Sequence, residues 1–240
     1  MERIILIETS TALCSVALAE NGAIVDYRES SAPKAHASLT AVFIQEMLAE
    51  RGLTINDCDA VCVSMGPGSY TGLRVGVSTA KGLCFGARKP LIAVGTLDTL
   101  VAQAADAAGP DYKYIVPMID ARRMEVYTAT FVRSTDAPTG CCSESGWVQT
   151  TETAPMIIDE NSFADILADG PVLFIGDGAG KCSDVIKHQN AHFCQCHPKA
   201  SSMLSPALAA YKEKRFEDVA YFEPFYLKEF VATVSKKKLF

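Results

Sequence analysis

Residues 61–94 read VCVSMGPGSYTGLRVGVSTAKGLCFGARKPLIAV, and this stretch decides the expected fold of the 240-residue chain. An apolar run at 60–64 predicts a buried strand, which bends at Gly66-Pro67-Gly68. A helix follows and ends near Gly86, and a second apolar run at 91–94 predicts the next strand. Strand, glycine turn, helix and strand in this order are typical of a parallel α/β layer.

The helix expected over this stretch has two contrasting faces. At 3.6 residues per turn, one face carries Gly72, Gly76, Thr79 and Leu83. The opposite face carries Arg74, Ser78, Lys81 and Phe85. A glycine inside a helix costs about 1 kcal/mol relative to alanine, so we expect the glycine face to approach a sheet closely. Because the helix is apolar nearly all round, we expect a second molecule to cover the face that the chain's own sheet leaves free.

Several segments together carry a resemblance to a known family. They are GPGSYTGLRVG (66–76), AKGLCFG (80–86), AVGTLDTL (93–100), ILIETSTALCSVAL (5–18), MIDARRMEVYTATF (118–131) and EPFYLKEFVA (223–232). With these segments the chain resembles the TsaB (YeaZ) family over nearly its whole length, most weakly at 134–200.

The resemblance implies an α/β protein with an actin-like (ASKHA) fold, made of two duplicated ribonuclease-H-like halves of which the second is reduced. It also implies a role in making the threonylcarbamoyl-adenosine of tRNA position 37. In that family the protein is a non-catalytic scaffold and activating subunit that binds the related catalytic subunit TsaD, and a TsaE-type ATPase joins the complex. The alternative function is an enzyme in its own right, either an actin-like ATPase or a peptidase.

Composition sets limits that agree with this expectation. The net charge is −6 and the pI is about 5.3, so we expect tRNA to be bound only through a complex. The N-terminus does not have the pattern of a signal peptide, and no apolar run reaches the roughly 18 residues of a membrane span. Nine cysteines, several in expected core positions, suit a reducing compartment, so we expect a cytoplasmic protein without membrane contact.

Two halves are expected, with the boundary near Gly109-Pro110. The first, 1–109, carries the partner-binding helices, and the second, 110–240, is smaller and ends in a tail. The expected elements of the first half are strands at 3–8, 13–19 and 24–28, a helix at 37–51, the stretch described above, and a helix at 96–108 that Thr96 caps. An apolar run ending in an acid, a bend and an alternating strand then recur at 114–120 and 125–132, which favours an internal duplication. The remaining expected elements are a loop at 134–145, helices at 163–168, from 181 and at 202–214, and a strand at 172–175.

The resemblance implies that the family pairs through two helices, with TsaD or, alone, with a second copy as a homodimer. The helix at 37–51 shares the excess of apolar surface seen in the glycine helix. The residues expected at this partner interface are Leu39, Phe43, Met47, Arg74, Val77, Ser78, Lys81 and Phe85.

The stretch GDGAGK at 176–181 suggests a phosphate loop, but its spacing is wrong. A P-loop needs four residues between its glycines and a Ser or Thr after the lysine, whereas here three intervene and Cys182 follows. In actin-like folds a glycine pair at this place touches adenosine, and acids at strand ends hold phosphate and metal. No cofactor is expected, while weak or vestigial nucleotide contact stays open for Glu8, Thr9, Asp120, Gly176 and Gly178.

Two further groups of residues are candidates for metal chemistry. Strand alternation would place His192, Cys194 and Cys196 on one face, with Cys182 as a fourth zinc ligand, but no CxxC pair is present. The family's catalytic subunit carries a metal-binding histidine pair just after the strand at 91–94, and those positions are Thr96 and Leu100 here. No catalytic residue and no metal site are therefore expected.

Overall fold

The computed structural model describes residues 2–107, 112–135 and 146–227. The first lobe is built on a five-stranded sheet with the order β3-β2-β1-β4-β5. Its strands are β1 (Arg3–Glu8), β2 (Cys14–Glu20), β3 (Ala23–Ser30), β4 (Ala60–Gly66) and β5 (Leu91–Gly95). The central strand β1 runs antiparallel to β2 and parallel to β4. All three strands expected before residue 30 and the parallel layer at 61–94 are confirmed.

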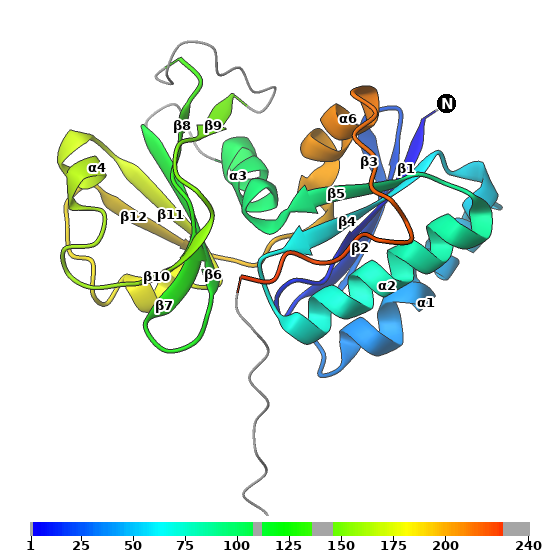
Figure 1. Cartoon of the computed structure of the whole chain (residues 1–240), viewed down its shortest axis with the longest axis horizontal. Helices are drawn as coiled ribbons and strands as arrows, with labels where there is room; N and C mark the ends of the chain where they lie inside the picture. Colours follow the sequence, from blue (N-terminus) through cyan, green and yellow to red (C-terminus); the bar gives the residue numbers. More distant parts are fainter. Residues whose placement is uncertain (1, 108–111, 136–145, 228–240) are drawn as a thin grey trace, which may run out of the picture.

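Both faces of this sheet are buried. Successive strand residues alternate between two cores, so that Ile5 and Ile7 face one side while Ile4 and Leu6 face the other. Helices α1 (Ala35–Glu50) and α2 (Tyr70–Ala87) lie side by side over the first side (Figure 1). A short 3₁₀ turn, η1 (Ile55–Asp57), leads from α1 into β4.

The second lobe repeats the strand order of the first. The order β10-β7-β6-β11-β12 has β6 antiparallel to β7 and parallel to β11, as β1 is to β2 and β4. The strands are β6 (Tyr114–Asp120), β7 (Glu125–Thr128), β8 (Phe131–Arg133), β9 (Trp147–Gln149), β10 (Ala154–Ile157), β11 (Val172–Gly176) and β12 (Ala191–Gln195). Its helices are much shorter, since α4 (Ala164–Asp169) has six residues and α5 (Ala179–Cys182) has four.

Each lobe receives a helix from the other part of the chain. Helix α3 (Thr96–Ala107) follows β5 but packs its apolar side, including Leu100 and Val101, onto the second sheet. Helix α6 (Leu204–Lys212) and the 3₁₀ turn η2 (Ala200–Met203) follow β12 but cover the free face of the first sheet. The two lobes are thus tied together by exchanged helices (Figure 1). The expected boundary at Gly109-Pro110 lies outside the described residues and stays a prediction.

Several expected elements of the second half are wrong in detail. The strand expected at 125–132 is two strands, because Pro117 of β6 has no N–H to continue the ladder and accepts a hydrogen bond from the Thr128 hydroxyl instead (2.8 Å). β9 and β10 were not predicted, and the last helix is η2 followed by α6. Residues 136–145 of the expected loop lie outside the described residues. No helix of the described chain is both long and apolar enough to cross a bilayer.

Candidate docking face and interlobe sites

The inner face of α2 is a glycine seam against the turn between β1 and β2. A Cβ atom added to Gly72 would lie 2.0 Å from the Thr9 carbonyl oxygen, and one on Gly76 would lie 2.2 Å from Thr9 Oγ1. At the start of the helix, a Cβ on Gly68 would lie 2.3 Å from the Ser10 carbonyl oxygen. The Ser69 side chain caps the helix by accepting a hydrogen bond from Gly72 N. The close approach expected for the glycine face is confirmed, with the turn rather than a strand as its main partner.

The outer face of α2 is open to solvent and carries mostly small side chains. Gly82 and Gly86 have no atom within 4 Å of an added Cβ, and Ser78 one turn earlier is exposed. Phe85 is 83% exposed on the same face. The neighbouring helix α1 also exposes small side chains, and its Val42 is 39% exposed. The two helices therefore form one continuous surface, most of which residues 2–107, 112–135 and 146–227 leave uncovered (Figure 1).

The structure removes two residues from the expected partner interface. Met47 is 1% exposed and Val77 is 4% exposed, because both point into the core between the helices and the first sheet. Leu39 and Phe43 are half-buried on α1. Arg74, Ser78 and Phe85 are exposed as expected, so the accessible part of the predicted set lies mainly on α2.

The C-terminal segment 216–227, here called the strap, crosses the α2 side of the first lobe (Figure 1). It begins with a bridge to the edge strand β5, where Glu217 N donates to Leu91 O (2.8 Å). Phe222 then inserts into the core beside α2, and Phe225 N donates to Met65 O (2.8 Å). At the start of α2, the Tyr226 ring lies 4.8 Å from that of Tyr70. Sequence reasoning missed the strap, although its density of aromatic residues was a signal of burial.

Lys81 belongs to the strap contact as well as to the helix. Its Nζ donates to the carbonyl oxygens of Ala220 (3.1 Å) and Phe222 (2.9 Å). Lys81 is therefore half-buried rather than a free charge on the outer face of α2.

Glu8, expected as a vestigial nucleotide contact, lies under the glycine seam. Glu8 and Thr9 are both 0% exposed, so neither reaches a ligand from solvent in this conformation. Glu8 Oε1 accepts a hydrogen bond from Ser10 N (2.7 Å), while Glu8 Oε2 has no partner in the described part of the chain. Burial raises the pKa of Glu8 above its ordinary value, although hydrogen bonds with Ser10 and Ser64 oppose this shift.

Glu8→Gln is expected to change the free energy of unfolding, relative to the wild type, more favourably at pH 8 than at pH 5. A raised folded-state pKa means that the folded protein holds the proton more tightly, so the contribution of Glu8 to stability is lost as pH rises through that pKa. Gln keeps the acceptor for Ser10 N and does not ionise. Urea unfolding of both proteins at the two pH values measures the difference, and an equal difference at pH 5 and pH 8 would contradict the prediction.

The other expected nucleotide residues form the end of the second sheet. Gly178 N donates to Met118 O (2.9 Å), and a Cβ on Gly176 would lie 2.2 Å from the same oxygen. Lys181 Nζ forms an ion pair with Asp120 and donates to the carbonyls of Arg123 and Glu125 (both 2.7 Å). Close packing thus accounts for these glycines, and Lys181 holds the turn after β6. Nucleotide contact at Asp120, Gly176 and Gly178 stays a prediction.

The positions of the absent histidine pair are part of the fold. Thr96 is 0% exposed, and its hydroxyl pairs with Ser64 Oγ (2.8 Å) instead of capping α3. Leu100 is 0% exposed in the core of the second lobe. Neither side chain faces an open site.

The expected cysteine and histidine cluster is divided by the second sheet. Cys182 is buried with α4 and α5 on one side of the sheet, whereas Cys196 packs with α3 on the other. His192 and Cys194 are exposed on β12. Among residues 2–107, 112–135 and 146–227, no three His, Cys, Asp or Glu side chains are grouped so that they could hold a metal ion.

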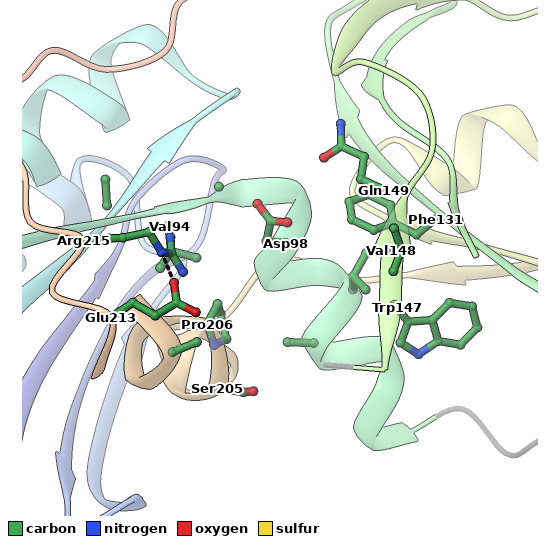
Figure 2. Close-up of a pocket in the computed structure, with 15 residues that line it drawn as sticks. Val94, Asp98, Phe131, Trp147, Val148, Gln149, Ser205, Pro206, Glu213 and Arg215 are labelled. Carbon is green, nitrogen blue, oxygen red and sulfur yellow. Dashed lines mark hydrogen bonds and ion pairs between the residues drawn. The ribbon is translucent and has the colours of Figure 1, made fainter. Parts of the chain in front are cut away.

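A cavity of about 420 Å³ lies between the lobes, lined by β5, α3 and α6 on one side and by β8 and β9 on the other (Figure 2). The Asp98 carboxyl lines the cavity. Desolvation by the surrounding protein raises the pKa of Asp98, although the residue keeps some contact with solvent. Arg215 opposes this shift and pairs with Glu213 (2.5 Å). Trp147 on the far wall packs against Arg133. Sequence reasoning did not predict this cavity, whose walls come from segments far apart in the chain.

Comparisons with known proteins agree on one relationship. Residues 29–236 match the family model TsaD, described as tRNA N6-adenosine threonylcarbamoyltransferase. The chain is 31% identical over 240 residues to the tRNA threonylcarbamoyladenosine biosynthesis protein TsaB of Escherichia coli strain K12, covering 96% of each chain. A tRNA N6-adenosine threonylcarbamoyltransferase of Maricaulis maris is 43% identical over 67 residues, which are 28% of this chain and 18% of that protein.

The fold is also found among solved structures. The structure titled YeaZ from Pseudomonas aeruginosa superposes with a TM-score of 0.80 at 24% identity, covering 95% of this chain and 100% of the other. A second structure from the same organism, described as similar to peptidase YEAZ, gives a TM-score of 0.81 with the same identity and coverage. These likenesses and the TsaD family match support an ASKHA-type α/β fold.

Proposed function

Because the chain belongs to the TsaB (YeaZ) family, we propose that it is a non-catalytic scaffold and activating subunit of the complex that makes N6-threonylcarbamoyladenosine at tRNA position 37. The names of its homologues indicate involvement in tRNA threonylcarbamoyladenosine biosynthesis. The proposed partner is a TsaD-type catalytic subunit. The observation that carries the proposal is the uncovered surface of α1 and α2, on which Ser78, Gly82 and Phe85 are exposed.

The shape of this surface suits a pair of helices from another protein. Small side chains at Ser78, Gly82 and Gly86 repeat every four residues along α2, which allows a second helix to approach to about 8 Å. Phe85 beside them offers a large apolar side chain at the edge of the contact. Because this surface has few charged groups, docking a second helix on it removes little strongly bound water and brings the two helices into close van der Waals contact, as expected for a stable subunit interface.

The proposed lack of catalysis rests on the two positions after β5. Thr96 and Leu100 occupy the places of the metal-binding histidines in the catalytic relative, and both are buried in contacts of the fold itself. A transfer reaction centred on that metal has no ligands here, so we infer that the chain supports a threonylcarbamoyl transferase without being one.

The remaining parts of the proposal follow the family. A TsaE-type ATPase joins the complex, tRNA is bound only through it, and the chain pairs with a second copy when alone. We propose a cytoplasmic location, no resident cofactor and at most vestigial nucleotide contact. The matching strand orders of the two lobes support an origin by duplication, with the helices of the second half reduced.

Reconstitution tests the proposal directly. The purified chain alone, given tRNA, ATP and an activated threonylcarbamoyl donor, is expected to make no modified tRNA. Adding the chain to the TsaD-type and TsaE-type proteins of the same source, with the same donor, is expected to restore modification. Omitting only this chain is the control. Modification by the lone chain, free of contaminating partner, would show that it is an enzyme and would overturn the non-catalytic role.

The acidic balance of the chain leads to a second expected outcome. A net charge of −6 opposes tight contact with the phosphates of a nucleic acid. Its own affinity for tRNA is therefore expected to be weak and to show no preference among tRNA sequences. A sub-micromolar dissociation constant at physiological salt, measured by filter binding, would contradict this.

A further inference from the structure

Among the described residues, two strongly exposed aromatic residues lie near one lysine of α2. Phe85 is 83% exposed and Tyr221 is 84% exposed. Lys81 Nζ binds the carbonyl oxygens of Ala220 and Phe222, the two neighbours of Tyr221 in the strap. Phe85 follows Lys81 by four residues and so lies one turn further along the same face of α2. The helix and the strap therefore place the Lys81 ammonium, one exposed aromatic residue of α2 and one exposed aromatic residue of the strap in one patch.

Most of the exposed large hydrophobic side chains of the described residues gather on this side of the first lobe. The exceptions are Ile157 on β10 of the second lobe and Phe216, whose ring lies 5.9 Å from that of Tyr211 on α6, on the other face of the first sheet. The others belong to α1, α2 or the strap: Val42, Phe85, Tyr221, Phe225 and Tyr226. Aromatic side chains that cluster on a surface are typical anchors of a protein interface.

The charge of this patch indicates what covers it. Lys81 has two carbonyl acceptors but no carboxylate partner in the described part of the chain. A partner that covers the patch removes water from this ammonium, so it must supply an acidic side chain to avoid an unpaired buried charge. Helix α2 itself contains no Asp or Glu, and its charges are Arg74 and Lys81. A second copy docked through the same helix would place like charges together, so the pairing proposed for the chain alone is weaker than the pairing with a partner that supplies acidic side chains.

We propose that the docking face extends from the two helices onto the strap, where Phe85 and Tyr221 are aromatic anchors and Lys81 between them binds an acidic residue on an apolar helix of a different protein. This inference rests on the proposed function, which makes the TsaD-type subunit that different protein. The strap is then part of the interface as well as a support for α2.

The test compares single alanine variants for binding to the purified TsaD-type subunit by isothermal titration calorimetry. Phe85→Ala and Tyr221→Ala are each expected to weaken binding at least tenfold and to leave the melting temperature nearly unchanged, because both side chains are exposed in the free chain. Ile157→Ala is the matched control, since Ile157 is 74% exposed on the second lobe. It is expected to bind within twofold of the wild type. Light scattering of each variant alone measures pairing with a second copy.

The outcomes separate this inference from the function on which it rests. Suppose that Tyr221→Ala and Phe85→Ala bind the TsaD-type subunit as tightly as the wild type, while Ser78→Arg does not bind it. The docking face then does not include the strap, so the inference is wrong but the proposed function stands. If the aromatic variants lose self-association and keep their affinity for the TsaD-type subunit, a second copy is the occupant and the inference is wrong. If the wild type forms no complex at all, the proposed function fails as well.

Discussion

Gly72→Ala is expected to lower the free energy of unfolding by about 3 kcal/mol, the upper part of the range for overpacking a core. The added methyl group would lie 2.0 Å from the carbonyl oxygen of Thr9. This oxygen cannot move aside easily, because Thr9 Oγ1 donates to Gly72 O (2.8 Å) and Ser69 N donates to the carbonyl oxygen of Ser10 (2.6 Å). Helix and turn are thus held together on both sides of the clash. Urea unfolding followed by circular dichroism measures the loss.

Gly82→Ala is the matched control in the same helix. Gly82 has no atom within 4 Å of an added Cβ, so alanine meets no clash and gains the usual helix propensity. It is expected to raise the free energy of unfolding by about 1 kcal/mol. Changes of opposite sign in the free energy of unfolding of Gly72→Ala and Gly82→Ala would locate the close contact on the inner face of α2. Equal effects would show that the seam against Thr9 does not hold the helix.

The glycine pattern also shows why the first lobe could be predicted from the sequence. Gly72 and Gly76 recur every four residues, which placed them on one helix face before any contact was known. The strands around them contain apolar runs of four residues and are bounded by turns, so their positions were clear as well. These signals are local, and local signals can be read without the rest of the chain.

The second lobe was predicted less well because its elements are short and depend on distant partners. β8 and β9 have three residues each, too few for a recognisable alternation. The break between β7 and β8 is caused by Pro117 in another strand. The exchange of α3 and α6 between the lobes likewise depends on which sheet each helix meets, and the helix sequence alone does not contain this information.

The candidate site shows the same division. The exposure of Ser78 and Phe85 follows from the helical period and is confirmed. Val77 was expected in the partner interface but is buried. Adjacent residues of a helix are about 100° apart around its axis, and the helical period alone does not show at which residue the buried face begins. The partner of Lys81 could not be predicted, since it lies 139 residues away in a strap with no regular secondary structure.

Ser78→Arg is expected to abolish binding of the TsaD-type subunit without harming the free chain. Ser78 is exposed on the outer face of α2, so arginine there is hydrated and should change the free energy of unfolding by less than about 0.5 kcal/mol. In the proposed complex the same position lies between helices. An unpaired charge buried there costs about 3–5 kcal/mol, and the long side chain prevents the close approach that Ser78 and Gly82 allow.

A cost of this size lowers affinity more than a hundredfold, which calorimetry with the TsaD-type subunit can measure. Gln189→Arg, at an exposed position of the second lobe, adds the same side chain away from the face and controls for the change in net charge. Unchanged circular dichroism and melting temperature of Ser78→Arg would exclude misfolding as the cause of lost binding. If Ser78→Arg binds within threefold of the wild type, the outer face of α2 is not the docking surface. Because the described part of the free chain leaves this face uncovered, its small side chains would then have no explanation in the described fold. The search for the partner's site would move to the cavity between the lobes.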